Sequence, residues 1–264
     1  MPDTPTILLT NDDGIHAPGL IELKRALSSL GQVIVFAPDH NWSAAGHTKT
    51  MHKPLRVSQA HLADGSSAFV TSGTPSDCVG LALLGLIPAW PDLVISGVND
   101  GPNLGADITY SGTVASAMEA VISGIPAIAA SQDWGQDRDL EMAAALTAHL
   151  AACVLAHGLP GQVFLNLNIP ALPRARLRGL RVTRLGQRVY RDVLIERSDP
   201  RGKPYYWIGG EPPTGVADPD PDTDIGALAE GYASVTPLNM DMTDQGFLST
   251  LRSWDLSWEA IPPA

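Results

Sequence analysis

Two adjacent carboxylates near the N-terminus, Asp12 and Asp13, are the residues best suited to chemistry. They follow an apolar and β-branched run that starts at Thr6 and is typical of a buried parallel strand, and they precede Gly14. Neighbouring carboxylates repel one another unless a cation or a proton lies between them, so a metal ion is the simplest occupant. The alternative interpretation is an Asx-rich turn that caps the following helix.

Ser43 and Asn99 follow two further predicted strands, residues 32–37 and 92–96. Open α/β sheets bind ligands outside the carboxyl ends of their strands, so we expect both side chains to converge with Asp12 and Asp13. The four residues would offer two carboxylates, one hydroxyl and one carboxamide. This all-oxygen set suits Mg²⁺ or Mn²⁺ and suits zinc poorly.

A second candidate feature is the run Ser111, Gly112 and Thr113, which opens a predicted helix over residues 114–123. A helix start offers an anion its backbone N–H groups, these hydroxyls and the positive end of the helix dipole. A metal site beside such a helix start predicts phosphate chemistry. Taken singly, each residue is equally an ordinary cap, turn or loop residue, and only the shared position after strand ends favours function.

The elements that must position these residues alternate between strand and helix. Predicted strands begin at residue 6 and cover 32–37, 92–96, 126–130 and 163–168, and predicted helices cover 18–30, 75–86, 114–123 and 140–157. The predicted helix at 75–86 has Thr74 as its N-cap and places Val79, Leu83 and Leu86 toward the core. A hairpin is predicted from 55–57 and 68–71. The alternation predicts right-handed βαβ units in an α/β domain.

Beyond Pro173 the composition changes, and a long β-hairpin arm is predicted from residues 189–195 and 204–208. The acidic run 218–224 lacks the glycine and the closing glutamate of an EF-hand, so we interpret it as a solvated loop that ends at the N-cap Asp224. A strand is predicted at 232–236. An apolar stripe of Phe247, Leu251, Trp254 and Trp258 then predicts a terminal helix packed against a partner.

Composition narrows the class of protein. The 264 residues are 44% apolar and carry a net charge of −11, which argues against binding nucleic acid. No run approaches the roughly 18 uninterrupted apolar residues of a membrane helix, and no signal peptide is visible, so we expect a cytoplasmic protein without a membrane partner. Cys78 and Cys153 lie in apolar predicted helices, and no disulfide is expected.

The sequence lacks the motifs of three other enzyme classes. There is no G-x-S-x-G elbow of a serine esterase. The run from Gly46 to Thr50 lacks the Gly-Lys-Ser/Thr of a phosphate-binding loop. Asn11 occupies the position of the nucleophile in aspartyl-phosphate-forming phosphatases and cannot serve as one. His47 and Lys49 lie on a predicted loop over the site, residues 43–50, where either contacts a phosphate or faces solvent.

Several motifs, in order, resemble the stationary-phase survival protein SurE family. They are ILLTNDDGIHAPG (7–19), APDHNWSA (37–44), GTPSDCV (73–79), SGVNDGPNLG (96–105), YSGTVASA (110–117), DPRG (199–202), YWI (206–208) and GYASVTPL (231–238). The resemblance covers nearly the whole chain. It implies a metal-dependent 5′/3′-nucleotidase that hydrolyses nucleoside monophosphates; the alternative is a nucleotide-sensing or assembly module that binds phosphate without turnover.

The resemblance also assigns roles by position. It places one divalent metal ion per subunit, Mg²⁺ or Mn²⁺, on Asp12, Asp13, Ser43 and Asn99, and the phosphate on Asn103, Ser111, Gly112 and Thr113. Asp12 and Asp13 are also the candidate catalytic residues, since either carboxylate can accept a proton from the attacking water. Residues 40–42 and Asp100 are positions where members vary, and they bear on substrate preference.

The resemblance further implies a Rossmann-like, mostly parallel sheet flanked by helices, with a β-hairpin arm and an exchanged C-terminal segment that build homodimers and homotetramers. The expected division is a catalytic core (1–180), an oligomerisation arm and loop (181–235), and a C-terminal extension exchanged between subunits (236–264). The exchange would give Trp254 and Trp258 their partner.

Overall fold

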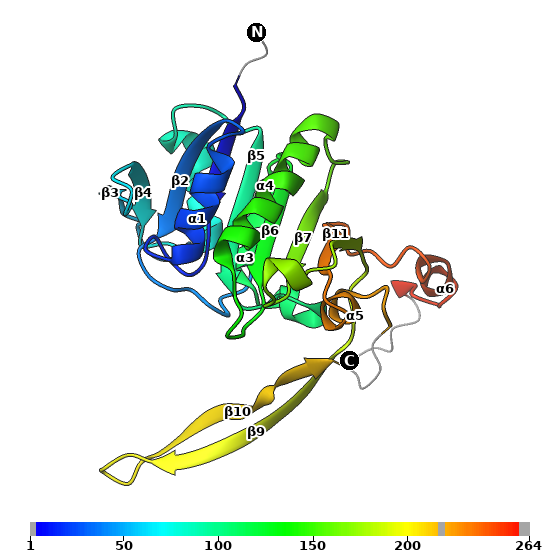
Figure 1. Ribbon diagram of the computed structural model, residues 1–264. Helices are drawn as coiled ribbons and strands as arrows, with labels where there is room; N and C mark the ends of the chain where they lie inside the picture. The colour runs from blue at the N-terminus through cyan, green and yellow to red at the C-terminus, as the bar shows by residue number, and fades with distance from the viewer. Residues whose placement is uncertain (1–3, 216–219, 259–264) are drawn as a thin grey trace.

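A computed structural model describes residues 4–215 and 220–258. Within these residues, the main sheet has nine strands in the order β3-β4-β2-β1-β5-β6-β7-β11-β8 (Figure 1). Their bounds are β1 Thr6–Thr10, β2 Gln32–Pro38, β3 Val57–His61, β4 Ser67–Thr71, β5 Leu93–Asp100, β6 Ala127–Gln132, β7 Val163–Ile169, β8 Leu180–Val182 and β11 Ala233–Asn239. Six adjacent strands in this order, β4, β2, β1, β5, β6 and β7, run parallel to one another. Strand β3 pairs antiparallel with β4, and β11 pairs antiparallel with β7. The predicted α/β class with a mostly parallel sheet is therefore confirmed.

Helices cover both faces of the sheet and bury alternate residues of its strands. Ile7 and Leu9 of β1 belong to one apolar cluster, with α1 (Pro18–Leu27) and α4 (Leu140–His157), whereas Leu8 belongs to the cluster on the other face. That second face is covered by α2 (Pro75–Leu81) and α3 (Gly112–Ile122). Alternation with a period of two places successive residues of a strand on opposite faces. By length and composition alone α4 could cross a membrane, and here it packs on α1 and the sheet.

The predicted helix extends to Leu86 as expected, but Leu86 does not face the core, and the predicted end of the next strand is wrong. After α2 the chain continues as a π-helical turn, Ala82–Leu86, in which Gly85 has a φ of 107°, and Leu86 is exposed rather than buried. Strand β5 does not end at residue 96 but continues to Asp100, with an irregularity in its pairing to β6 between Ser96 and Asn99. This extension carries Asn99 to the edge of the sheet where β1 ends.

The predicted arm is present and longer than expected. Strands β9 (Arg188–Ser198) and β10 (Pro204–Gly215) pair antiparallel and project away from the main sheet (Figure 1). The predicted terminal helix is mostly wrong: α6 covers only Leu248–Arg252, and Trp254 and Trp258 are exposed beyond its end.

Asp224 is not the N-cap of α5 (Asp224–Ala229), as the sequence predicts. Thr223 is the cap, and its hydroxyl accepts a hydrogen bond from the Gly226 N–H at 3.1 Å. Asp224 is fully buried, and its carboxylate accepts hydrogen bonds from the N–H groups of Gly105, Gly186 and Ile225 at 2.7–2.8 Å. It therefore joins the start of α5 to the loop after β5 and to the root of the arm.

We expect Asp224→Ala to lower the free energy of unfolding by about 3 kcal/mol or more, because three buried N–H groups lose their acceptor. Urea denaturation measures this loss, with the exposed neighbour Asp222→Ala as the matched control. A loss no greater than that of Asp222→Ala would contradict this role of Asp224.

Candidate active site

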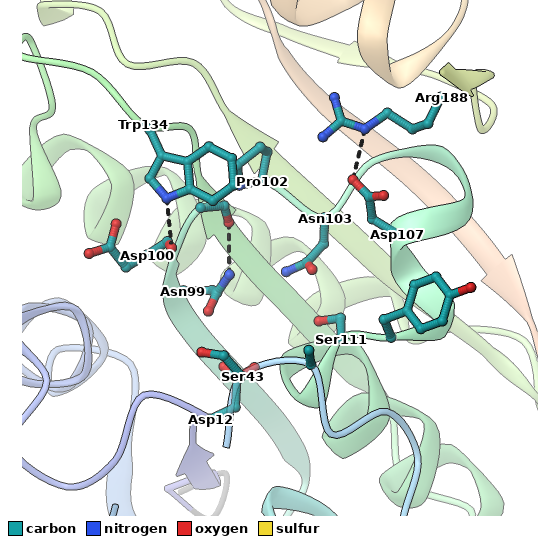
Figure 2. A pocket seen from close by; sticks show the side chains of 13 residues that line it. Asp12, Ser43, Asn99, Asp100, Pro102, Asn103, Asp107, Ser111, Trp134 and Arg188 are labelled. Carbon is teal, nitrogen blue, oxygen red and sulfur yellow. Dashed lines mark hydrogen bonds and ion pairs between the residues drawn. The ribbon is translucent and has the colours of Figure 1, made fainter. Parts of the chain in front are cut away.

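A cavity of about 270 Å³ opens at the carboxyl ends of the parallel strands (Figure 2). Five of the eight predicted site residues line it: Asp12, Ser43, Asn99, Asn103 and Ser111. The other three, Asp13, Gly112 and Thr113, are not among its lining residues. The remaining wall consists of Ala44, Asp100, Gly101, Pro102, Asp107, Tyr110, Trp134 and Arg188. The cavity therefore contains most of the predicted polar centre together with an aromatic and charged rim.

Asp12 is buried just after the end of β1 and lies against the start of α3. Its side chain accepts a hydrogen bond from the Thr113 hydroxyl at 2.5 Å, and Asp12 is only 3% exposed to solvent. Burial raises the pKa of Asp12 to about 6, and the neighbouring Asp13 adds to the rise, whereas the Thr113 hydrogen bond opposes it. The Thr113 hydroxyl therefore binds Asp12 and does not line the cavity.

Gly112 allows α3 to approach Asp12 this closely. A Cβ atom at Gly112 would lie 2.8 Å from the Asp12 Cβ and 3.0 Å from its Oδ2. Ser111 is the N-cap of the helix and accepts a hydrogen bond from the Val114 N–H at 3.1 Å. The helix start and the carboxylate thus form one packed unit.

Asp13 is half-buried and is held by polar groups from the loop after β2 and from the end of β5. Its two carboxylate oxygens accept hydrogen bonds from the Asn41 side chain at 3.2 Å and from the Asp100 N–H at 3.1 Å. Burial raises the pKa of Asp13 and the charge of the Asp100 carboxylate adds to the rise, while the hydrogen bond from the Asp100 N–H and the charge of Arg138 oppose it. Arg138 itself pairs with the Asp100 carboxylate at 2.5 Å.

Asn99, near the end of β5, and Ser43, in the loop after β2, both face Asp12. The Asn99 amide nitrogen donates to the Gly101 carbonyl at 2.8 Å, which directs the amide oxygen toward Ser43 and Asp12 (Figure 2). Ser43 is exposed, and its main-chain N–H donates to Asn41 Oδ1 at 2.7 Å. The predicted convergence of Asp12, Ser43 and Asn99 on one cavity is therefore found in the structure.

A buried polar network that the sequence analysis missed holds Asn103. The Asn103 amide nitrogen donates to the Ser131 hydroxyl at 2.7 Å, and the Asn103 main chain bonds with the side chains of Asn166 and Asn168. An amide NH₂ has two donors, so one remains for a ligand. Asn166 and Asn168 alternate with apolar residues in β7, and that polar pattern within a core strand was the available signal.

Glu119 of α3 binds the predicted loop over the site, residues 43–50, through two side-chain contacts. The buried Glu119 carboxylate contacts His47 Nε2 at 3.1 Å and Lys49 Nζ at 2.6 Å. Burial acts to raise the pKa of Glu119, but the hydrogen bonds from His47 and Lys49 leave it below its ordinary value. His47 and Lys49 therefore anchor this loop, and neither lines the cavity with Asp12.

The donor chemistry of the site fits a hard divalent cation. Within the described residues no group of three or more His, Cys, Asp or Glu side chains could hold a metal, so the site depends on amide and hydroxyl oxygens as well. Magnesium sites commonly use only one or two carboxylates and complete their shell with water and phosphate. The buried Asp12 carboxylate, which has no cationic partner among its described contacts, also gains from a positive charge.

Together, the fold and the site define a Rossmann-like α/β protein with an oxygen-rich polar cavity at the carboxyl ends of its strands. The sequence profile of the family described as Survival protein SurE matches residues 7–192. The chain belongs to the SurE family, as its motifs predict.

Relatives and a solved structure agree with this assignment. A protein of Chloroflexus aggregans named 5′-nucleotidase SurE is 51% identical over 255 residues, covering 96% of this chain and 99% of the relative. One of Herpetosiphon aurantiacus with the same name is 50% identical over 247 residues, covering 93% and 96%. The crystal structure of the SurE protein from Aquifex aeolicus superposes with a TM-score of 0.81 at 42% identity, covering 94% of this chain and 98% of that one.

We expect Gly112→Ala to reduce phosphate release from AMP by about 100-fold, because the new Cβ displaces Asp12 from its position under α3. Steady-state kinetics measure the change. Gly80→Ala is the matched control, since this glycine also lies in a helix and an added Cβ there meets only Glu119 Oε1, at 4.0 Å. Equal activity in the two variants would contradict the packing argument.

Proposed function

We propose that this chain is a divalent-metal-dependent phosphomonoesterase that hydrolyses nucleoside 5′-monophosphates, and also 3′-monophosphates, to nucleoside and phosphate. The observation that carries the proposal is the contact between Asp12 and the start of α3, with Thr113 Oγ1 2.5 Å from the carboxylate. This contact brings a candidate cation site and a candidate phosphate site together in one cavity. The names of the relatives, 5′-nucleotidase SurE, support the same activity.

The start of α3 would bind the phosphoryl group. The first N–H groups of an α-helix have no acceptor within the helix, so that of Gly112 can donate to an equatorial phosphate oxygen, whereas the Thr113 N–H already bonds to the Asp12 carboxylate. The Ser111 hydroxyl and the remaining donor of the Asn103 amide lie on the same cavity wall. Such fixed donors stabilise the negative charge that develops during phosphoryl transfer.

Asp12, Asp13, Ser43 and Asn99 would hold one Mg²⁺ or Mn²⁺ ion. When bound, such an ion supplies Lewis-acid polarisation of the phosphoryl group and lowers the pKa of water. Asp12 or Asp13 would accept the proton of the attacking water and thereby make the water nucleophilic. The hydrogen bonds to Asp13 from Asn41 and from the Asp100 N–H fix that carboxylate for either role.

We expect Asp13→Ala to lower metal-dependent phosphate release by at least about 100-fold, because both a metal ligand and a candidate proton acceptor are lost. The assay uses chelator-stripped protein with Mg²⁺ or Mn²⁺ added back, and 5′- and 3′-monophosphates as substrates. Asp64→Asn is the control, since Asp64 pairs with Lys24 on the distant β3–β4 hairpin.

Full activity of Asp13→Ala at low metal concentration would contradict the assignment of this carboxylate. Nucleotide binding without phosphate release by the unaltered protein, under every metal, would instead favour a sensing module.

We further propose that the chain works as a homodimer or homotetramer, with residues 1–180 as the catalytic core, 181–235 as an arm and 236–264 as an exchanged extension. The arm supports this proposal because an isolated two-stranded ribbon is marginally stable in water. Trp207 is 63% exposed and Ile208 is 83% exposed, and adjacent strand residues lie on opposite faces of the ribbon. Both faces therefore carry apolar surface that a second copy would cover.

The C-terminal segment supports the same assembly. Trp254 and Trp258 are exposed, although large apolar side chains usually pack. A largely apolar groove of about 620 Å³ lies beside β11 and is lined by residues that include Phe164, Leu238 and Met242. An extension from another subunit would cover such surface.

We expect the double variant Trp207→Asp, Ile208→Asp to form smaller oligomers, because charges on both faces of the arm oppose burial. Light scattering after size-exclusion chromatography gives the mass. Leu84→Asp is the control, because Leu84 is 86% exposed on the turn after α2. An unchanged mass in the arm variant would show that the arm does not assemble the subunits.

A further inference from the structure

The active-site cavity is larger than a phosphate group needs, and one of its walls is aromatic. Its volume of about 270 Å³ approaches the lower limit of pockets that bind whole small molecules, roughly 300 Å³. Figure 2 shows Asn99 and Asn103 between the Trp134 ring and the pair Asp12 and Ser43. The Trp134 end therefore lies beyond the polar centre, where the remainder of a phosphate ester would extend.

The Trp134 ring is fixed although it is 57% exposed. Its indole N–H donates to the Asp100 carbonyl oxygen at 3.1 Å, and its main-chain N–H donates to Asp133 Oδ1 at 2.8 Å. The ring also lies against Gly101, where an added Cβ would be 2.5 Å from the ring atom Cζ2. A fixed aromatic ring loses little conformational freedom when a ligand stacks on it.

The segment that fixes this ring also fixes the proposed metal site. The Asp100 main chain accepts the indole hydrogen bond through its carbonyl and donates to the Asp13 carboxylate through its N–H. Because one residue holds both groups, the ring has a defined position relative to Asp13. That is the arrangement a substrate needs when one end reacts and the other end is recognised.

The charged side chains along the outer cavity are already paired. Arg138 binds Asp100 at 2.5 Å, and Arg188 binds Asp107 at 2.8 Å. Tyr190 also donates to the Asp107 carboxylate at 2.5 Å. Among the residues that line the Trp134 end of the cavity, no cation is therefore left unpaired. This end suits a flat, uncharged group better than a second phosphate.

We infer that Trp134 is the stacking platform for the base of the nucleoside monophosphate, and so a specificity-determining residue of the reaction. The inference rests on the proposed nucleotidase function. Base-to-aromatic stacking tolerates every base because each has a π-face, and purines offer the larger overlap. The chain is therefore expected to favour purine over pyrimidine monophosphates.

The test compares AMP with ribose 5-phosphate, which carries the same 5′-phosphate without a base. We expect Trp134→Ala to raise the KM for AMP roughly 10- to 100-fold, the usual range for a lost stacking contact, and to leave its kcat unchanged. The kinetic constants for ribose 5-phosphate stay as in the unaltered protein. Trp134→Phe retains a ring and recovers most of the affinity for AMP.

The control is Trp90→Ala. Trp90 is 61% exposed and precedes β5, at the end of the sheet opposite the cavity, so its loss leaves both substrates unaffected. Equal losses for AMP and ribose 5-phosphate in Trp134→Ala would overturn the inference, because a merely structural role affects both. Unchanged constants for both substrates, or loss of base selectivity in Tyr110→Ala instead, would overturn it too.

A titration of adenosine into the chelator-stripped protein separates this inference from the proposed function. Calorimetry is expected to detect adenosine binding that Trp134→Ala weakens and Trp90→Ala preserves. If the unaltered protein releases no phosphate from any nucleotide, the proposed function fails, and the titration still decides whether Trp134 binds the base. Adenosine affinity that is equal in the two variants would overturn the stacking role.

Discussion

A carboxylate buried beside a second carboxylate and without a cationic partner is costly, and Asp12 is in this position. Two features of the start of α3 stabilise Asp12 after β1: the Thr113 hydroxyl donates a hydrogen bond to its carboxylate, and Gly112 allows the helix to approach it closely. Burial, with the neighbouring Asp13, raises the pKa of Asp12 to about 6. A divalent ion would relieve this cost, because the charge of the ion stabilises both the carboxylates and a bound phosphate.

The surrounding loops are arranged to keep this centre in place. Asp100 holds Asp13 on one side and Trp134 on the other, and Glu119 fastens the loop that carries Ser43 to the helix whose start contacts Asp12. Because Glu119 and Thr113 both belong to α3, that helix positions the proposed phosphate site and supports the proposed metal site. Interactions of this kind give a site rigid geometry before any ligand binds.

The sequence predicts the parts of this structure that depend on local pattern. Apolar strands ending in polar residues identified Asp12, Ser43 and Asn99, and the run before α3 identified Ser111. The unforeseen parts depend on contacts between distant residues: Thr113 donates to Asp12 across 101 positions, and Asn103 binds Asn168 across 65. The prediction of a terminal helix that includes Trp254 and Trp258 is wrong, because apolar residues at helical spacing do not by themselves keep the chain helical. Helix α6 ends at Arg252. Asp224 was misjudged because two of its three N–H partners, Gly105 and Gly186, come from segments that only the fold brings close to it.

We propose that Asp12, Asp13, Ser43 and Asn99 hold one divalent ion beside the start of α3. Anomalous diffraction from crystals grown with Mn²⁺ and phosphate is the most direct test. We expect one manganese peak per subunit that is coordinated by oxygens of these side chains, with phosphate density beside the Gly112 N–H. A manganese peak away from these residues, or none at saturating Mn²⁺, would contradict it.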